Sequence, residues 1–279
     1  MLRIGTQTFG LGKELSSDLA GTIRNLHEMG FNAVEPLVLF NGKQGRMPRN
    51  LWALDTLAQA KKIMDQLGMV IPSVHIGIGF GKVSMPAAMA IKKILALHQS
   101  IGVEYFVVTG PFGDEKTAKK WGKLMRKISH GVKPHGCTMV YHNHEDEFRE
   151  VTVNGKPMTA LEYFFELAGP DVMLQLDIGW ASLAGDEMEA ARRYADRIVS
   201  IHLKDFYPGY RDGNFTRLNM PDEQFAPIGE GTVKTAEILS MRESFPHFSG
   251  SIIIDQDKYK ADMLESLKIG CRNIQSKLD

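Results

Sequence analysis

Cysteine is scarce in this sequence. Its 279 residues include only two cysteines, Cys137 and Cys271, which do not form a C-x-x-C pair. Two cysteines so far apart are too few for the disulfide framework of a small secreted domain. We therefore expect a protein of the reducing cytoplasm.

An excess of charge of either sign is also lacking, as are long apolar runs. The chain carries 33 basic and 33 acidic residues, so its formal net charge is zero and gives no reason to expect binding to a phosphate backbone or an anionic membrane. No apolar run is long enough to span a bilayer, and Met1 leads into Leu2-Arg3-Ile4-Gly5 without a basic and then apolar leader. These absences predict a soluble, unprocessed protein that binds neither nucleic acid nor membrane.

What the sequence has instead is an alternation of short β-rich runs and longer helical patterns. Apolar residues recur at helical spacing between the runs, as at Leu54, Leu57 and Ala60 before the glycine stop at Gly68. Other helices are expected to start near Asp18, Met85, Asp114, Thr159, Asp186, Thr232 and Lys258. The eight runs that predict strands begin at Arg3, Asn32, Met69, Glu104, Thr138, Val172, Ile198 and Gly250.

Eight strand and helix repeats, with several strands apolar on both faces, predict a parallel sheet closed into an α/β (β/α)8 TIM barrel, a single domain over residues 1–279. An open doubly wound sheet is the alternative. A dinucleotide-binding sheet of that kind requires G-x-G-x-x-G after the first strand, but QTFGLGKEL lacks the third glycine. In a barrel the active site gathers at the carboxyl ends of the strands, and polar residues end strand after strand here.

The segment 138–148, TMVYHNHEDEF, runs from an apolar strand directly into two histidines and three carboxylates. His142 and His144 are two residues apart, so an extended backbone points both imidazoles to the same side. Strict alternation would put Glu145 on the opposite face unless the strand ends or bends before it. One strand is thus expected to deliver two imidazoles into one space.

Five motifs at the strand ends make the sequence resemble the xylose isomerase-like TIM barrels, a family of sugar isomerases and epimerases, inosose dehydratases and the endonuclease IV group. The motifs are YHNHEDEF, LDIGWA, HLKD, PIGEGTV and IIIDQD, which begin at Tyr141, Leu176, His202, Pro227 and Ile252. The resemblance spans essentially the whole chain and implies a divalent metal, Mn, Mg, Co or Zn, at the ends of strands five to eight. The ligands it implies are Glu145, Asp177, His202 and Asp255, with His142 as the substitute for Glu145.

The resemblance also implies an acid and base pair, from which this sequence departs. Family epimerases use the carboxylates of the fifth and eighth strands, but the eighth strand here carries the shorter Asp255 in place of glutamate. Loss of one methylene shortens the reach of the pair. The expected catalytic residues are Glu145, His144 and Lys204.

A further set of polar and aromatic residues is expected to contact the substrate. It comprises Glu35, His75, His142, Trp180, Arg211, Glu230 and Asp257. Trp180 stands where some family epimerases have a substrate-binding histidine, and it either stacks on a sugar face or packs under the barrel rim. Lys204 either polarises a carbonyl or hydroxyl or pairs with Asp177 or Glu230. Glu35 either bonds to the substrate or ties the barrel together.

The irregular stretch of residues 206–226 shows no clear periodicity and is rich in aromatic and polar side chains, among them Tyr207, Tyr210, Arg211 and Arg217. Long loops at the active face of a barrel often form lids or binding walls. The mixture suits a polyhydroxylated ligand, and the two arginines leave a phosphorylated sugar open.

Together, the resemblance and these residues imply a metal-dependent isomerase or epimerase of a sugar, sugar phosphate or keto-sugar, which removes an α-proton and passes through a metal-stabilised enediolate. If a β-oxygen leaves instead, the same site gives a dehydratase or lyase acting on a keto-sugar, keto-glycoside or inosose. A barrel that binds sugar without catalysis is the third hypothesis. The expected partner is a small-molecule sugar or cyclitol, and a homodimer is considered as the assembly.

Overall fold

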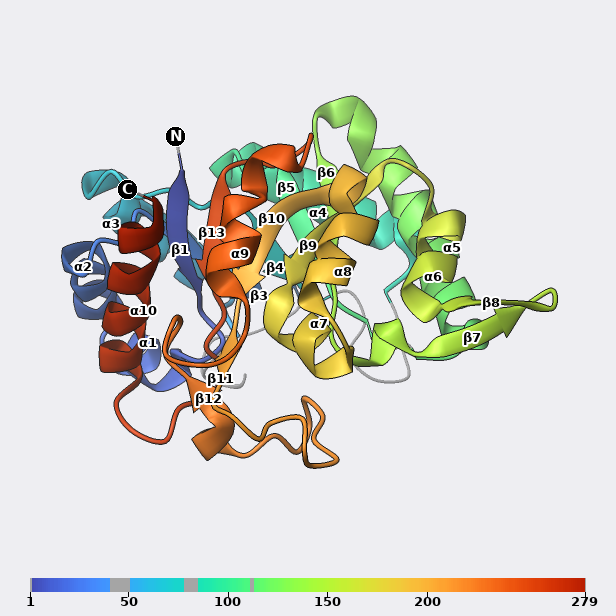
Figure 1. Ribbon diagram of the computed structural model, residues 1–279. Helices are drawn as coiled ribbons and strands as arrows, with labels where there is room; N and C mark the ends of the chain where they lie inside the picture. The colour runs from blue at the N-terminus through green and yellow to red at the C-terminus, as the bar shows by residue number, and fades with distance from the viewer. Residues whose placement is uncertain (1, 41–50, 78–84, 111–112, 279) are drawn as a thin grey trace.

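All eight predicted β-rich runs contribute parallel strands to one sheet in the computed structural model of this protein, which describes residues 2–40, 51–77, 85–110 and 113–278 (Figure 1). The sheet has nine strands in the order β2-β1-β13-β10-β9-β6-β5-β4-β3. Their bounds are β1 Arg3–Gln7, β2 Ala33–Glu35, β3 Leu37–Val38, β4 Val74–Ile76, β5 Tyr105–Val108, β6 Thr138–His142, β9 Val172–Asp177, β10 Ile198–Leu203 and β13 Ser251–Ile254.

The ninth strand arises because Pro36 divides the second predicted strand into β2 and β3. Proline has no N–H to donate to a neighbouring strand, so the ladder is interrupted at this residue. β2 pairs with β1 at one end of the strand order, and β3 pairs with β4 at the other. Val34 also donates its N–H to the Val70 carbonyl, at 3.0 Å, on the chain leading into β4. The two ends of the sheet therefore meet in a single-domain TIM barrel, and the open doubly wound alternative is wrong.

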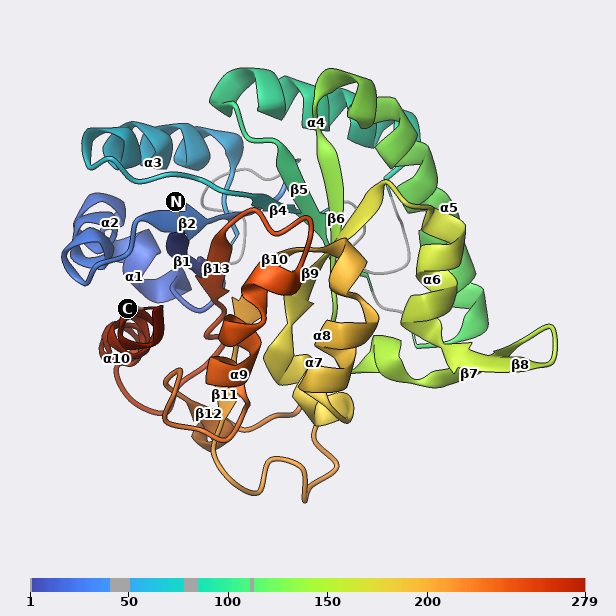
Figure 2. The same ribbon diagram turned by 45° about the horizontal axis from the view of Figure 1, so that its top comes forward.

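Helices alternate with the strands and form a ring around the barrel (Figure 2). Four of them begin at predicted start residues that cap the helix, since the side chains of Asp18, Asp114, Thr159 and Asp186 accept hydrogen bonds from backbone N–H groups in the first turn. The bounds are α1 Gly12–Ser17, α2 Leu19–Glu28, α3 Leu54–Gln66, α4 Ala87–Ile101, α5 Glu115–Val132, α6 Ala160–Ala168, α7 Ile178–Ala184, α8 Glu187–Arg193, α9 Thr235–Ser240 and α10 Met263–Leu278. Within the described ranges, no helix has the length and apolar character needed to span a membrane.

Two short antiparallel ladders lie outside the barrel sheet. β7 (Glu150–Val153) and β8 (Lys156–Thr159) form a hairpin that projects from the body of the protein beyond α6 (Figure 1). β11 (Asp205–Phe206) pairs with β12 (Phe225–Ala226) just after β10. This second ladder joins the two ends of the predicted irregular stretch. Residues 207–224, here called the wall segment, therefore stand at the carboxyl ends of the barrel strands.

The barrel interior changes from apolar to polar along the strands. Val107, Val140 and Val199 form a small buried cluster of their own, with Met173 packed against it. His142 and Gln175 lie two residues beyond Val140 and Met173, so they face the same interior. The apolar layer closes the barrel from below, and the polar side chains gather above it at the carboxyl ends.

Candidate active site

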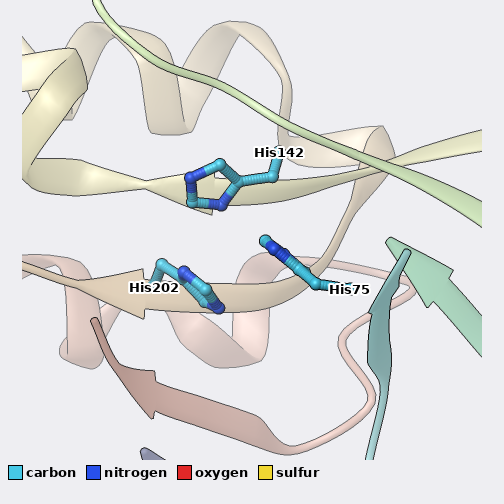
Figure 3. Close-up of side chains that lie close together, drawn as sticks. All are labelled: His75, His142 and His202. Atoms are coloured by element: carbon cyan, nitrogen blue, oxygen red, sulfur yellow. The ribbon is translucent and has the colours of Figure 1, made fainter. Parts of the chain in front are cut away.

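Three imidazoles meet inside the barrel from the carboxyl ends of β4, β6 and β10 (Figure 3). They belong to His75, His142 and His202, each no more than 4% exposed. The ring centroid of His142 lies 5.1 Å from that of His75 and 4.7 Å from that of His202. His144 follows the end of β6, and its ring centroid is 5.0 Å from that of His142. The prediction that one strand brings two imidazoles together is confirmed.

A buried chain of hydrogen bonds underlies these rings. The amide Nε2 of Gln7 donates to Nδ1 of His75 at 3.2 Å, and Nε2 of His75 donates to Oε1 of Gln175 at 2.7 Å. Gln175 Nε2 in turn donates to Glu35 Oε2 at 2.7 Å, and Glu35 Oε1 accepts from His202 Nε2 at 2.8 Å. We call these five residues the floor network. An amide nitrogen only donates, and amide and carboxylate oxygens only accept. These bonds therefore place a ring hydrogen on Nε2 of His75 and on Nε2 of His202.

The floor network leaves one ring nitrogen of His142 and one of His202 free for other partners. His142 Nδ1 lies 3.2 Å from the Gln175 oxygen, so Nε2 carries its lone pair. That Nε2 faces Asp177 Oδ2 at 3.8 Å. Nδ1 of His202, whose Nε2 is engaged with Glu35, lies 3.3 Å from Asp255 Oδ2.

His142, Asp177, His202 and Asp255 could together hold a metal ion. Each offers one ligand atom, and these atoms all lie within 4.8 Å of one another. Asp177 Oδ2 and His202 Nδ1 are buried atoms without a hydrogen-bond partner in the part of the chain that the structure describes. Burying such atoms is costly unless a partner is supplied. Two imidazoles and two carboxylates suit Mn, Co or Zn, so the residues fit a divalent ion.

Glu145 lies outside this group of four. β6 ends at His142, and residues 146–148 turn in a short 3-10 helix. Oε1 of Glu145 accepts the backbone N–H of Arg217 at 3.0 Å. Of the two candidates for the fifth-strand ligand, the fold therefore brings His142 to the group, and Glu145 attaches the wall segment to the end of β6.

Lys204 supplies positive charge to the same site. Its Nζ lies 2.7 Å from Asp257 Oδ2, 3.0 Å from Asp255 Oδ2 and 3.7 Å from Asp177 Oδ2. The predicted pairing with Asp177 is thus present at long range, while Asp255 and Asp257 are the closer partners. Gly179 makes room for this arrangement, because a Cβ there would lie 2.6 Å from the Lys204 Cβ.

Burial and charge act in opposite directions on the ionisable groups. Burial lowers the pKa of His202, but the charges of Glu35 and Asp255 outweigh it and raise the pKa to about 10. Burial raises the pKa of Glu35, but the facing His202 and His75 bring it down to about 2. Burial raises the pKa of Asp177 to about 7, against the pull of Lys204. The site thus holds a proton on His202 in the same space where a metal would bind.

Four other predicted contact residues occupy different surroundings. Trp180 is 1% exposed and packs on Phe206, which agrees with packing under the barrel rim, and it also lines the cavity, so stacking on a sugar face stays a prediction. Glu35 is fully buried in the floor network and ties the barrel together. Arg211 pairs with Glu187 of α8 at 3.3 Å and does not line the cavity. Glu230 is exposed on its turn and also stands outside the cavity lining.

Glu147 was not singled out from the sequence, although it is fully buried. Its Oε2 accepts the backbone N–H of His144 at 2.8 Å, and its Oε1 lies 2.7 Å from the Tyr141 hydroxyl. That hydroxyl also lies 2.9 Å from the Gly110 carbonyl, and its single hydrogen serves only one of the two oxygens. Burial raises the pKa of Glu147 to about 8. A protonated Glu147 donating to Tyr141 satisfies both oxygens.

A cavity of about 450 Å³ opens above the imidazoles. Its lining comprises Gln7, Phe9, Leu37, His75, Thr109, Gly110, His142, His144, Trp180, Arg217, Leu218, Phe225, Asp255, Asp257 and Lys258. The predicted wall is therefore present, and Arg217 and Leu218 are the residues of the wall segment that line the cavity. Gln175 was also missed, and the signal was available: it is a polar residue inside an apolar strand, two positions before Asp177.

Comparison with known proteins gives the same picture of the fold. A family model described as xylose isomerase-like TIM barrel matches residues 23–269. No curated protein matches the chain. A sugar phosphate isomerase/epimerase from Parabacteroides distasonis superimposes with a TM-score of 0.71 and 21% identity, covering 99% of this chain and 94% of that one.

Two further solved structures resemble the chain at lower identity. A probable 3-DHS dehydratase from Bacillus anthracis has a TM-score of 0.72 and 13% identity over 98% of this chain and 99% of that one. A xylose isomerase-like TIM barrel protein from Mycobacterium smegmatis, in complex with magnesium, has a TM-score of 0.68 and 13% identity over 100% and 97%. At such identities the likeness shows a common fold.

Proposed function

Because the chain belongs to the xylose isomerase-like TIM barrel family, we propose that it is a divalent-metal-dependent isomerase or epimerase of a sugar, sugar phosphate or keto-sugar. The observation that supports this most is the group of His142, Asp177, His202 and Asp255 at the base of a ligand-sized cavity. A divalent ion held by these four side chains would act as a Lewis acid toward a sugar carbonyl.

Proton transfer in this proposal belongs to residues that line the cavity beside that group. Burial lowers the pKa of His144 well below its ordinary value, so its imidazole is neutral at pH 7 and can accept a proton. Thr109 Oγ1 lies 3.1 Å from Nδ1 of His144 and orients the ring. Asp257 also lines the cavity, but its Oδ2 lies 2.7 Å from Lys204 Nζ, so it serves as a counter-ion of that ammonium. The Lys204 ammonium beside it offsets negative charge that develops on a substrate oxygen.

A dehydratase or lyase is the second candidate, and the position of Asp255 favours it. Its carboxylate lies 3.0 Å from Lys204 Nζ and 3.3 Å from His202 Nδ1, so it is held as a counter-ion rather than as a free base. Glu145, the other member of the expected pair, is occupied by Arg217. A single base suffices for elimination, because the proton that it removes can return to the departing oxygen, while the Lys204 ammonium offsets the negative charge on that oxygen.

Partner and compartment form part of the same proposal. The ligand is a small sugar or cyclitol, with neither nucleic acid nor a membrane involved, and a homodimer remains a prediction. The two cysteines, Cys137 and Cys271, are free and buried. Free thiols are compatible with the cytoplasm as the site of action.

Hydrogen exchange in heavy water tests the reaction. The protein would be stripped with a chelator, reloaded with Mn²⁺ and incubated with a panel of keto-sugars, and the products would be followed by NMR. Deuterium at the α-carbon without loss of water or aglycone is expected for the isomerase. Loss of water or aglycone would establish the second candidate. A protein that shows neither outcome, while still binding sugar, would be the inactive sugar-binding barrel.

A further inference from the structure

Two large apolar side chains stand exposed at the mouth of the active-site cavity. Leu218 is 83% exposed and Phe9 is 39% exposed, and both line the cavity whose base holds His142 and Asp255. Single exposed apolar residues need no explanation. Two at the rim of one cavity, joined by Leu37 in its lining, form an apolar collar over a polar base.

The collar is held in position although it is exposed. On one side of Leu218, the backbone N–H of Arg217 donates to Glu145 at 3.0 Å. On the other side, Lys258 Nζ donates to the carbonyl of Met220 at 3.0 Å. These two bonds attach the tip of the wall segment to the ends of β6 and β13. Because the backbone on either side of Leu218 is already held, less of the wall segment has to be ordered when a ligand binds.

Charge at the cavity does not favour an anionic ligand. The lining holds two cations, and each already has a carboxylate nearby: Arg217 lies 3.5 Å from Asp146, and Lys258 lies 3.5 Å from Asp222. Lys204, buried beside the lining, lies 2.7 Å from Asp257. A phosphate would have to displace one of these partners and would face two cavity carboxylates. Arg217 Nη1, the atom that lies 3.5 Å from Asp146, makes no hydrogen bond among the described residues, and an uncharged sugar oxygen is sufficient to satisfy this donor.

We propose that the substrate is a neutral keto-glycoside with an apolar aglycone, rather than a free keto-sugar or a sugar phosphate; this rests on the second candidate of the proposed function, whose reaction needs the carbonyl of the keto-sugar unit. The sugar ring contacts the imidazoles and carboxylates at the base of the cavity. The aglycone lies against the collar of Phe9, Leu37 and Leu218. A cavity of about 450 Å³ lies within the range that encloses ligands of this size.

Paired glycosides test the collar by equilibrium binding. The Mn²⁺-loaded protein would be titrated calorimetrically with phenyl and methyl β-glucoside, with the two β-xylosides as a second pair, and with glucose and glucose 6-phosphate. We expect each phenyl glycoside to bind about tenfold tighter than its methyl counterpart, since its ring buries additional apolar area. Glucose 6-phosphate is expected to bind no tighter than glucose.

Substitution of the collar shows where the preference arises. Leu218→Ser should reduce the preference for phenyl over methyl to about twofold or less, while leaving affinity for the methyl glycoside unchanged. Leu54→Ser is the matched control, because Leu54 is 45% exposed on α3, outside this cavity. It should keep the full preference.

Equal affinity within both glycoside pairs, tighter binding of glucose 6-phosphate than of glucose, an unchanged preference in Leu218→Ser, or no binding of any glycoside would each overturn the proposal. These outcomes are independent of catalysis. Exchange of an α-proton without a phenyl preference would leave the proposed function intact, and a phenyl preference without exchange or elimination would leave only the aglycone site.

Discussion

The floor network and the wall segment meet at the same cavity, but they are built differently. The five side chains of the floor network come from barrel strands, are no more than 5% exposed, and are bonded to one another. The wall segment has only a three-residue 3-10 helix as regular structure, and it carries Leu218 at 83% exposure. Its tip is attached by two hydrogen bonds: the Arg217 N–H donates to Glu145, and Lys258 donates to the Met220 carbonyl.

This difference indicates that the floor network and the wall segment have different roles. Buried and fully bonded side chains on rigid strands hold lone pairs in place, which a metal site requires. An irregular segment tied at a few points presents side chains that can change without disturbing the barrel. We infer that the floor network governs which atoms are free for chemistry, and that the wall segment governs which ligand is admitted.

The largest expected effect separates His142 from Glu145. His142→Ala should lower Mn²⁺ affinity by more than the 10–100-fold typical of a residue that acts through a ligand, because it removes a ligand itself. Glu145→Ala should leave Mn²⁺ affinity nearly unchanged and weaken ligand binding instead, because it releases the wall segment at Arg217. Calorimetric titration with Mn²⁺ and then with a glycoside measures both. Loss of the metal in Glu145→Ala alone would reverse our assignment.

An intermediate effect is expected when the floor network is broken without removing a ligand. Glu35→Gln keeps the shape but places an amide donor against the donor of either Gln175 or His202, and it lowers the pKa of His202 by removing a facing charge. Mn²⁺ affinity should fall by about 10–100-fold.

Glu187→Gln provides a control, because Glu187 is equally buried but lies on α8, outside the cavity lining. Mn²⁺ affinity should be unchanged in this variant. A similar loss of affinity in both variants would mean that any buried glutamate has this effect, and would remove the special role of the floor network.

The last effect is on stability rather than on binding, and it concerns the junction of floor and wall. The unfolded chain releases the Glu147 proton near pH 4.5, whereas the folded protein keeps it to about pH 8, so rising pH through this window favours unfolding. Each pKa unit corresponds to about 1.4 kcal/mol. Glu147→Gln imitates the protonated acid and should gain stability relative to the native protein as pH rises from 5 to 8, measured by urea unfolding. A difference that does not vary with pH would contradict a protonated Glu147.

Most of the fold could be predicted from the sequence because its signals are local. The β-rich runs and capping residues such as Asp114 and Thr159 depend on neighbours in the chain, and most strands and helices begin close to where they were expected. β4 and α10 begin later than the expected Met69 and Lys258, and the short helices α1 and α7 were not expected. Division of the second strand at Pro36 was not anticipated. A proline interrupts a strand only where its missing N–H would have faced a neighbouring strand. Which neighbour lies there is decided by the pairing of β2 with β1 and of β3 with β4.

The sequence allowed us to predict which strand ends carry the residues of the site, but not which side chains bond to one another there. Asp177, His202 and Asp255 were expected to lie together because parallel strands end at one face, and they do. The choice between His142 and Glu145 required the residue at which β6 ends. Gln175 bonds to side chains from β2, β4 and β6, which no local pattern connects. Arg211 and Arg217 lie in a stretch without periodicity, so their directions could not be derived.

Lys204 has a consequence for whether this barrel needs an ion in order to fold. With Nζ close to three carboxylates, and with a proton on His202, the site carries its own compensating positive charge. Its negative groups therefore do not need an ion to be buried together, in contrast to small zinc domains that fold only when loaded. Under the proposed function, a divalent ion would enter a barrel that is already folded, and its supply after synthesis would matter as much as the ligands.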